Sequence, residues 1–261
     1  MLLELRDVSK EYPSRTRRMS LFKPNSGLKA VNGVNLAIRK GECVGLVGES
    51  GSGKSTLAKL MMNMEPVTSG QVLLKGQPIH ERKRNNRKTY KQMQLVLQDS
   101  SSSLYPKMRV KEILEEPLRN YFPQEKAMWD ARCAGLLELV DLDPSLLSRY
   151  PHQLSGGQKQ RVCLAKALAV RPEIIILDES VASLDEPSQR AVLAMLKRIQ
   201  KEQQLSLLFI THDVKSTRQL CDRVAIMYQG KLVETFSGRD CRQLQHPYSR
   251  LLFQAMPDES F

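Results

Sequence analysis

The chain has 261 residues, of which 41% are hydrophobic, which is enough to bury the core of one large α/β domain with a helical insert. Its longest apolar runs fall far short of the roughly 18 residues of a membrane-spanning helix, and its first residues favour a strand over a signal peptide, so we expect a cytosolic protein. The net charge of +12 is compatible with nucleic acid or an anionic membrane surface, but we interpret the basic clusters at 15–18 and 80–91 as solvated loops, because no aromatic residues interleave with them.

The N-terminal part of the chain predicts three strands. Residues 2–8 and 34–38 alternate apolar and polar side chains, as half-buried strands do. Between them, residues 13–27 are rich in Pro, Ser, Arg and Gly, which predicts a surface loop. The apolar run 43–47 predicts a strand that is buried on both faces.

The segment after this strand is the most informative in the chain. It leads into a helix-like run at 57–64 and consists of Gly48, Glu49, Ser50, Gly51, Ser52, Gly53, Lys54, Ser55 and Thr56. Glycines let the backbone wrap closely around one anion, and the helix N-terminus adds partial positive charge. Lys54 can reach the β and γ phosphates, and the Ser55 hydroxyl can bind Mg²⁺. A glycine turn with a chance lysine is the alternative, but a strand before and a helix after favour a nucleoside triphosphate site.

The middle of the chain changes pattern. Strand-like runs at 71–74 and 93–98 lie on either side of the second basic cluster. From 110 to 149 the apolar residues follow helical spacing, and we expect Pro117 and Pro123 to break the helices. A helix at 156–170 then returns the chain to the core. The short apolar runs that follow, at 174–178, 205–211 and 224–227, alternate with helices and predict a parallel sheet.

Two carboxylates, Asp178 and Glu179, close the buried strand at 174–178. Ligands of parallel α/β sheets sit at the carboxyl ends of strands. There Asp178 can hold Mg²⁺, and Glu179 can polarise a water aimed at the γ-phosphate. The alternative is an Asp-Glu pair that only complements a helix dipole, which a phosphate loop in the same chain makes less favoured.

A second anion-binding element lies at 154–158. Ser155, Gly156, Gly157 and Gln158 open the helix that begins at 156, where backbone N–H groups can bind a phosphate. Taken alone, the segment could be only an N-cap with a flexible entry. Two phosphate-binding elements far apart in one chain suggest two copies placed head to tail, with each second element closing on the nucleotide of the other copy.

The order of these motifs resembles the ATPase subunit of ABC transporters over essentially the whole chain. The resemblance is carried by 48–56, Gln98, 154–158, 174–179, 183–185 and His212. It implies an α/β fold: a P-loop NTPase (RecA-like) core with a mostly parallel sheet, an antiparallel β subdomain and an inserted α-helical subdomain. The core and β subdomain would span 1–98 and 171–235, the helical subdomain with the signature motif 99–170, and a short C-terminal extension 236–261.

The resemblance also implies roles for single residues, with ATP and Mg²⁺ as cofactors. Tyr12 would stack on adenine, although a tyrosine near a strand end is common. Gln98 would contact Mg²⁺ and the attacking water and couple to the membrane partner, unless it simply ends an exposed strand. His212 would contact the γ-phosphate and position the water of Glu179, unless it is only a satisfied histidine at a strand end. Lys54 and Mg²⁺ would stabilise the developing charge.

Further roles concern the partner subunit. Ser155, Gly156, Gly157 and Gln158 would grip the γ-phosphate of ATP bound to the opposite subunit, and Asp185 would lie at the dimer seam. Segments 98–106, 150–153 and 246–250 resemble the importer branch for oligopeptides, dipeptides and nickel. Segments 161–169 and 178–185 are most similar to the second ATPase subunit of nickel importers.

This branch implies a set of partners and a location. They are a homologous second ATPase subunit in a heterodimer, two integral membrane permease subunits and, indirectly, a substrate-binding protein, with no nucleic acid. The chain would act as a peripheral protein at the cytoplasmic face of the bacterial cell membrane. The expected cargo is nickel, another metal in chelated form, or a short peptide.

The sequence departs from the branch in two places. Ser180, Val181 and Ala182 stand where Pro-Thr-Ser is usual, at a position without phosphate contact in the family, so we still expect hydrolysis. Many members carry a C-terminal cysteine cluster for an iron–sulfur centre, whereas here Cys241 stands alone, so we expect no such cluster. No Cys-x-x-Cys pair points to a structural metal site, and we expect Cys43 and Cys163 to be small core residues. The chain stops soon after 246–250, so we expect no large regulatory domain.

Two other functions remain open. A nucleic-acid or repair ATPase of the same superfamily would use the positive charge, but only 99–153 separates Gln98 from the signature, too short for coiled-coil arms. The ATPase subunit of a soluble non-transport complex, such as one for phosphonate breakdown, resembles the same branch, because a fold does not fix a function.

Overall fold

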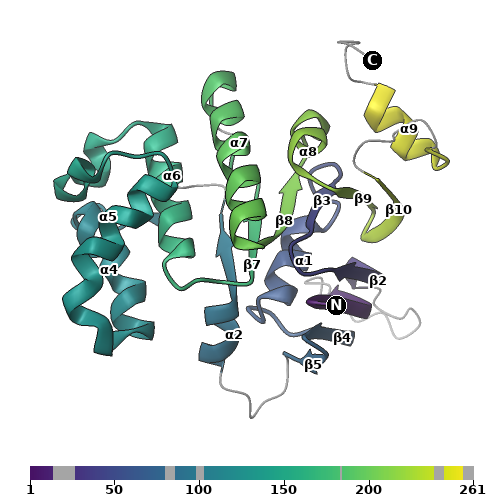
Figure 1. Cartoon of the computed structure of the whole chain (residues 1–261). Helices are drawn as coiled ribbons and strands as arrows, with labels where there is room; N and C mark the ends of the chain where they lie inside the picture. Colours follow the sequence, from purple (N-terminus) through teal and green to yellow (C-terminus); the bar gives the residue numbers. More distant parts are fainter. Residues whose placement is uncertain (14–26, 80–85, 98–102, 183, 238–243, 255–261) are drawn as a thin grey trace.

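The computed structural model describes residues 1–13, 27–79, 86–97, 103–182, 184–237 and 244–254, which form two sheets with helices around them (Figure 1). The predicted loop at 13–27 and the basic cluster at 15–18 therefore lie almost entirely outside the described residues, as do Gln98, Cys241 and part of the second basic cluster.

The larger sheet has six strands in the order β10-β9-β3-β8-β7-β6. All neighbours in it are parallel except β9 and β10. Its strands are β3 (Cys43–Val47), β6 (Met93–Val96), β7 (Ile174–Asp178), β8 (Ser206–Thr211), β9 (Arg223–Tyr228) and β10 (Lys231–Ser237). Every residue of β3, β7 and β8 is buried, as strands covered on both faces require. This confirms the predicted parallel sheet of short apolar strands.

The smaller sheet is antiparallel, in the order β2-β1-β4-β5. Its strands are β1 (Leu3–Tyr12), β2 (Leu28–Ile38), β4 (Ser69–Leu74) and β5 (Gln77–Pro78). β1 and β2 extend well beyond the predicted runs at 2–8 and 34–38. Three register shifts between Leu5 and Glu11 explain why, because each bulge moves the apolar side chains out of strict alternation.

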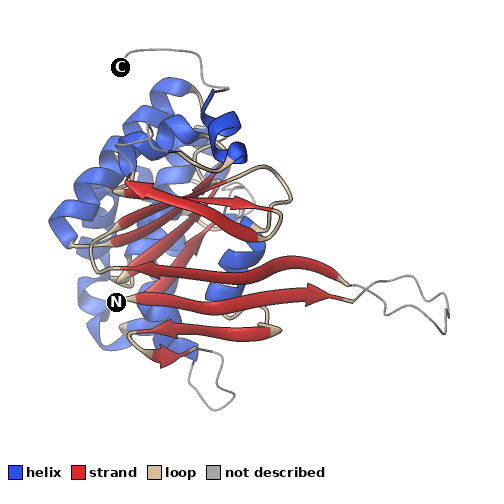
Figure 2. Cartoon of the chain, turned by 90° about the vertical axis from the view of Figure 1, so that its right-hand side faces the viewer, coloured by secondary structure: helices blue, strands red, loops and turns tan. Residues whose placement is uncertain are grey.

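The helices fall into two groups. Beside the sheets lie α1 (Lys54–Met61), α2 (Asn86–Gln92), α7 (Glu186–Gln203) and α8 (Val214–Leu220), and α9 (Pro247–Gln254) lies near β10. A separate group is built from α4 (Val110–Tyr121), α5 (Trp129–Leu139) and α6 (Gly156–Leu168), with the 3₁₀ turns η1 (Pro123–Met128), η2 (Pro144–Ser148) and η3 (Pro151–Gln153). Figure 2 shows the strands along one side of the molecule and most helices on the other.

Alternate residues of the central strands enter two different apolar cores. Val44 and Leu46 of β3 pack with α1 and the antiparallel sheet. Cys43 and Val47 face the core that includes α7 and the α4–α6 group. Gly45 lies between them, and a Cβ there would come within 3.1 Å of the side chains of α8 and of the residue after it. Apolar cores on both faces of the sheet thus fix β3 and the start of the turn that follows it.

One prediction about the helical group is wrong. Pro117 does not end a helix; it is buried inside α4, where the packing of Val110, Ile113 and Leu118 outweighs the lost backbone hydrogen bond. The next helix, α5, begins at Trp129, because the preceding residues form η1. Pro123 does mark a break, at the start of η1.

Four cysteines are buried and take part in no disulfide: Cys43, Cys133, Cys163 and Cys221. This confirms the interpretation of Cys43 and Cys163 as core residues. Within the described part of the chain, no helix combines the length and apolar character that crossing a membrane demands.

Candidate functional site

The glycine-rich segment forms a tight loop at the carboxyl edge of the large sheet. β3 ends at Val47 and α1 begins at Lys54, with Gly53 as its N-cap at φ 106°. A Cβ on Gly53 would lie 2.2 Å from the carbonyl oxygen of Ala30, and one on Gly48 would lie 2.2 Å from that of Met227. Glycine is therefore required at both ends, and the loop leads directly into the N-terminus of a helix, where anions bind.

The Lys54 ammonium lies inside this loop. Its Nζ donates hydrogen bonds to the carbonyl oxygens of Gly48 and Glu49, at 2.7 and 2.8 Å, and to Oγ of Ser52 at 3.4 Å. Only 4% of the residue is exposed. Burial lowers the pKa of Lys54, while the nearby carboxylates, Glu179 first among them, act in the opposite direction. The loop thus surrounds one positive charge, the ammonium group of Lys54.

Ser55 and Asp178 bring two oxygens together beside this charge. The Ser55 hydroxyl donates to Oδ1 of Asp178 at 3.2 Å. Asp178 is only 8% exposed, and burial raises its pKa, against the effects of Ser55 and Lys54. Mg²⁺ prefers oxygen ligands and is held in nucleotide sites by one or two side chains together with phosphates, so this pair fits the ion. Among the described residues, no cluster of three or more acidic, His or Cys side chains offers a larger metal site.

Glu179 and His212 meet at the ends of two adjacent strands. Asp178 of β7 pairs with Ile210 of β8, so the residues that follow these strands come side by side. Nδ1 of His212 lies 3.5 Å from Oε1 of Glu179. Glu179 has a left-handed backbone, φ 47°, and its N–H donates to the carbonyl of Ile210. The side chain of Glu179 is 21% exposed and that of His212 is 59% exposed, so the pair borders open space that a water molecule can occupy.

Tyr12 lies near the end of β1 and reaches α1. Its hydroxyl donates to Glu65, just beyond the helix. The pKa of Tyr12 is raised by burial and by Glu65, while a hydrogen bond with Thr56 lowers it. Thr56 belongs to the predicted phosphate-binding segment, so the structure brings Tyr12 beside that segment.

The second predicted anion-binding element is built as expected but stands apart. Ser155 caps α6: its hydroxyl accepts the N–H of Gln158, whose side chain accepts the N–H of Ser155 in return. Ser155 and Gly156 are exposed, and a Cβ on Gly156 would meet no atom within 4 Å. Among the described residues, no hydrogen bond joins this element to the phosphate loop. Asp185, also exposed, caps α7 through the N–H of Ser188.

One contact of the loop escapes the sequence analysis. The backbone N–H of Glu49 donates to the hydroxyl of Tyr248 in α9, at 2.9 Å. The segment 246–250 stands out in the sequence as a family-like motif, but nothing in its composition connects it to a loop 199 positions earlier. The role of Glu65 as the partner of Tyr12 is likewise invisible in the sequence, since no spacing rule links the two residues.

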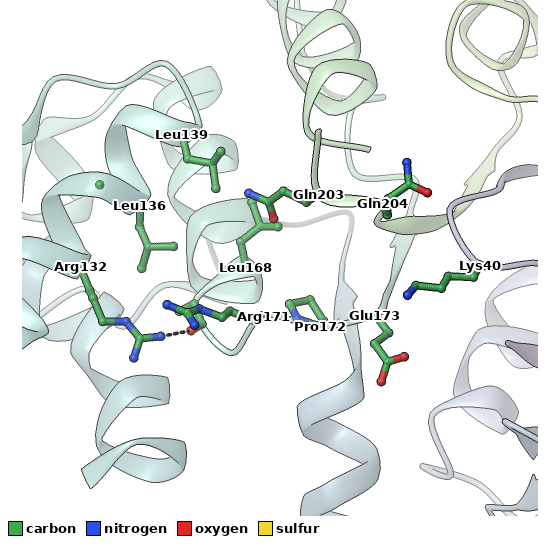
Figure 3. Close-up of a pocket in the computed structure, with 12 residues that line it drawn as sticks. Lys40, Arg132, Leu136, Leu139, Leu168, Arg171, Pro172, Glu173, Gln203 and Gln204 are labelled. Carbon is green, nitrogen blue, oxygen red and sulfur yellow. Dashed lines mark hydrogen bonds between the residues drawn. The ribbon is translucent and has the colours of Figure 1, made fainter. Parts of the chain in front are cut away.

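A cavity of about 570 Å³ lies at the other edge of the sheet, between the helical group and the core (Figure 3). Leu136 and Leu139 of α5 and Leu168 of α6 form its apolar wall. The opposite wall comes from the C-terminal end of α7 and from the residues before β7. It therefore lies away from the phosphate loop, which follows the carboxyl ends of the same strands.

Comparison with known proteins places this geometry in context. Residues 31–182 match the family described as ABC transporter. The chain is 41% identical to the oligopeptide transport ATP-binding protein OppF of Lactococcus lactis subsp. lactis (strain IL1403), over 98% of this chain and 80% of that protein. It is 46% identical to the nickel import ATP-binding protein NikE of Escherichia coli O6:K15:H31 (strain 536 / UPEC), over 78% of this chain and 77% of that protein.

Solved structures of ABC transporter proteins have a similar fold. CbiO1 of Clostridium perfringens, part of the ABC transporter complex cbiONQ, has a TM-score of 0.78 and 26% identity, covering 91% of this chain and 89% of that one. The ATP-binding cassette MJ0796, in a dimeric post-hydrolysis state bound to ADP and Pi, has a TM-score of 0.74 and 26% identity, covering 92% of this chain and 100% of that one. The predicted fold class, an α/β P-loop core with an antiparallel sheet and a helical insert, is therefore confirmed.

Proposed function

Because this chain belongs to the ABC transporter family, we propose that it is the ATP-hydrolysing subunit that powers an importer for nickel, another metal in chelated form, or short peptides. Members of this family bind and hydrolyse ATP. The observation that carries the proposal is the cluster of Lys54, Ser55, Asp178 and Glu179 at one edge of the sheet. The cargo class follows from similarity to OppF and NikE, whose names state oligopeptide transport and nickel import.

The residues of the site suit the steps of hydrolysis. Lys54 would give up part of its bonding within the loop and bind the phosphates. Glu179 would accept a proton from the attacking water, and His212 would hold Glu179 in place and contact the γ-phosphate. Mg²⁺, held by Ser55 and Asp178 and by Gln98 from outside the described residues, would supply charge neutralisation. Tyr12 would stack on the adenine.

The site of one chain is incomplete without a partner. The cap of α6, at Ser155 and Gly156, is exposed, and among the described residues no hydrogen bond links it to the phosphate loop of its own chain. We assign it to the γ-phosphate of a nucleotide on a homologous ATPase subunit placed head to tail, with Asp185 at the seam. ATP binding at two such sites would close the pair, and hydrolysis would reopen it.

The division of the chain follows from this arrangement. Residues 1–98 and 171–235 would form the nucleotide-binding core with its β subdomain, and 99–170 the helical subdomain that carries the signature. Residues 236–261 would be a short extension. The names of the relatives state oligopeptide transport and nickel import, and we infer that two permease subunits hold this chain at the cytoplasmic face of the bacterial membrane and receive a loaded substrate-binding protein from the other side.

The test is ATPase activity of the chain, first purified alone and then assembled in lipid with the homologous ATPase and the permeases encoded beside it. A nickel-loaded or peptide-loaded binding protein should stimulate hydrolysis, and the one that does so identifies the cargo. ATPase activity that changes with neither the permeases nor the binding proteins would contradict the importer function and favour the ATPase subunit of a soluble complex. Similarity to transport subunits does not favour that alternative, or a nucleic-acid ATPase.

A further inference from the structure

One side chain connects the C-terminal motif 246–250, which the proposed function leaves without a role, to the phosphate loop. The hydroxyl of Tyr248 accepts a hydrogen bond from the backbone N–H of Glu49 at an N···O distance of 2.9 Å. Tyr248 is only 8% exposed, so water competes little for this bond. Without it, the N–H of Glu49 would lose this part-buried hydrogen bond, which connects it to α9.

The peptide group between Gly48 and Glu49 is held from both sides. Its N–H bonds to Tyr248, and its carbonyl oxygen accepts from Nζ of Lys54 at 2.7 Å. The same Nζ bonds to two further oxygens of the loop, so all three of its N–H donors are engaged. A phosphate can therefore gain a hydrogen bond from Lys54 only when one of these bonds is released.

The position of the Tyr248 hydroxyl is fixed by the core sheet and not by the loop. Its ring stacks on Tyr228 at the end of β9, with the ring centroids 4.2 Å apart. The N–H of Tyr248 donates to Nδ1 of His246 at 3.2 Å. Glu234 of β10 accepts the backbone N–H groups of Gln245 and His246. The motif is thus fastened to β9 and β10 before it meets the phosphate loop.

We propose that Tyr248 is a positioning residue for ATP binding, whose hydroxyl keeps the Gly48–Glu49 peptide oriented when Lys54 moves from the loop onto the phosphates. This inference rests on the proposed function, because it requires ATP at this loop. Burial raises the pKa of Tyr248, so the hydroxyl stays protonated and adds no negative charge near the phosphates. The C-terminal motif then acts on the nucleotide site without touching the nucleotide.

The test compares two Tyr-to-Phe variants of the full chain. Tyr248→Phe keeps the stacked ring and removes the hydroxyl that meets Glu49. Tyr228→Phe removes the other hydroxyl of the same stack, whose recorded partner is the side chain of Gln229 at the surface, and so serves as the matched control. Affinity is measured by titration with a fluorescent ATP analogue, and KM and kcat are measured on the assembled complex.

Losing one backbone hydrogen bond to the loop should weaken ATP binding by about fivefold in Tyr248→Phe and raise KM to match. We expect kcat to stay within about twofold, because Asp178 and Glu179 are not disturbed. Hydrogen exchange in the peptide containing Glu49 should become faster. Tyr228→Phe should match the wild type in all three measurements.

A packing role alone would lower the melting temperature of Tyr248→Phe and leave ATP affinity, KM and loop exchange at the values of Tyr228→Phe, which would overturn the inference. Failure of the proposed function looks different, since the wild-type chain itself would then bind no ATP analogue.

Discussion

At the scale of single residues, the phosphate loop encloses the ammonium group of Lys54, and the nearby carboxylate of Asp178 lowers the stability of the folded chain. Asp178 is almost fully buried and has one hydroxyl as its hydrogen-bond donor. Burial raises its pKa, which means that the folded chain holds the ionised form less well than water does. Such a group is retained for what it binds and not for stability.

We therefore predict that Asp178→Asn abolishes hydrolysis but raises the melting temperature of the nucleotide-free chain at neutral pH. A gain of about 1 kcal/mol corresponds to roughly 2–4 °C for a chain of this size. Because the folded pKa of Asp178 is raised, the wild type gains stability as pH falls through that pKa, so the difference between the two should shrink there. Calorimetry across pH checks this.

The control is Asp130→Asn, which neutralises an exposed carboxylate paired with Lys111 on the helical group and should leave the melting temperature nearly unchanged. An Asp178→Asn chain less stable than the wild type at neutral pH would contradict the account of the buried charge.

Glu179→Gln should retain ATP binding and lose turnover. An amide keeps the shape of the side chain beside His212 but cannot accept the proton of the attacking water. We expect kcat to fall by about 10²-fold or more, with the affinity for ATP unchanged. Glu186→Gln, on the exposed face of α7, is the matched control, and normal turnover in Glu179→Gln would remove Glu179 from the role of base.

The sequence shows which residues of the site are chemically competent, but not all of their partners. Lys54, Ser55, Asp178 and Glu179 can be predicted because strand ends and a glycine loop place them by local rules. Tyr248 could not be, because its contact with Glu49 depends on how α9 packs against β9 and β10, and such packing leaves no periodic signal. Gln98 lies outside the described residues, so its role stays a prediction.

At the scale of elements, the carboxylate of Asp222 joins strands and a helix at the edge of the sheet opposite the phosphate loop. Asp222, just before β9, accepts hydrogen bonds from the N–H of Cys43 at 2.9 Å and from Gln200 at 3.0 Å. Lys197 donates to its other oxygen at 3.1 Å. Asp222 thereby ties the beginnings of β3 and β9 to the second half of α7, and so fixes the strand that leads into the loop.

Asp222→Ala should destabilise the chain by about 2 kcal/mol, because it removes an acceptor shared by three donors on β3 and α7 and leaves the N–H of Cys43 without its side-chain partner. ATP affinity should not change, since these donors lie at the far edge of the sheet. Burial acts to raise the pKa of Asp222, but the hydrogen bonds of Cys43, Lys197 and Gln200 leave it lowered. The stabilisation is therefore present above the unfolded carboxyl pKa of about 3.9 and is lost as pH falls below it.

The check is to compare the free energies of unfolding in urea of Asp222→Ala and of Asp130→Ala. Asp130→Ala is the control, because it removes only an exposed ion pair. Equal stability of the two variants at neutral pH would show that the joint contributes nothing.

Element types were easier to predict than element ends. The buried runs of β3, β7 and β8 are strands because they are short, apolar and bounded by turns. α4 was misjudged at Pro117, where a local rule about proline lost to the packing of the apolar face. The full length of β1 was hidden by its bulges, which only its pairing with β2 reveals.

At the scale of the whole molecule, the cap of α6, which we propose binds the nucleotide of a partner subunit, faces outward. The cap of α6 is exposed, and Gly156 has open space on the side where a side chain would stand. An added side chain there should therefore leave the single chain undisturbed and obstruct only a surface that meets a partner.

We predict that Gly156→Arg keeps ATP binding by the isolated chain but abolishes ATP-dependent pairing with the homologous ATPase subunit. In a Glu179→Gln background, which retains ATP, sedimentation should show the pair for the parent and at least a roughly tenfold weaker association for the variant, because an arginine cannot be desolvated there without a partner charge. Ser145→Arg, on another exposed part of the helical group, should pair normally. Undiminished pairing of Gly156→Arg would mean that the cap of α6 is not at the interface.

The cavity between the helical group and the core (Figure 3) has a pharmacological consequence. Its walls belong to two parts of the molecule, with Leu168 at the end of α6 on one side and Gln203 at the end of α7 on the other. A small compound seated there would contact α5, α6 and α7 at once. Since the cavity lies at the edge opposite the phosphate loop, such a compound would not have to compete with the high ATP concentration of a cell. It would also meet surfaces other than the nucleotide pocket common to all ATPases of this type, which is where selectivity between them can be gained.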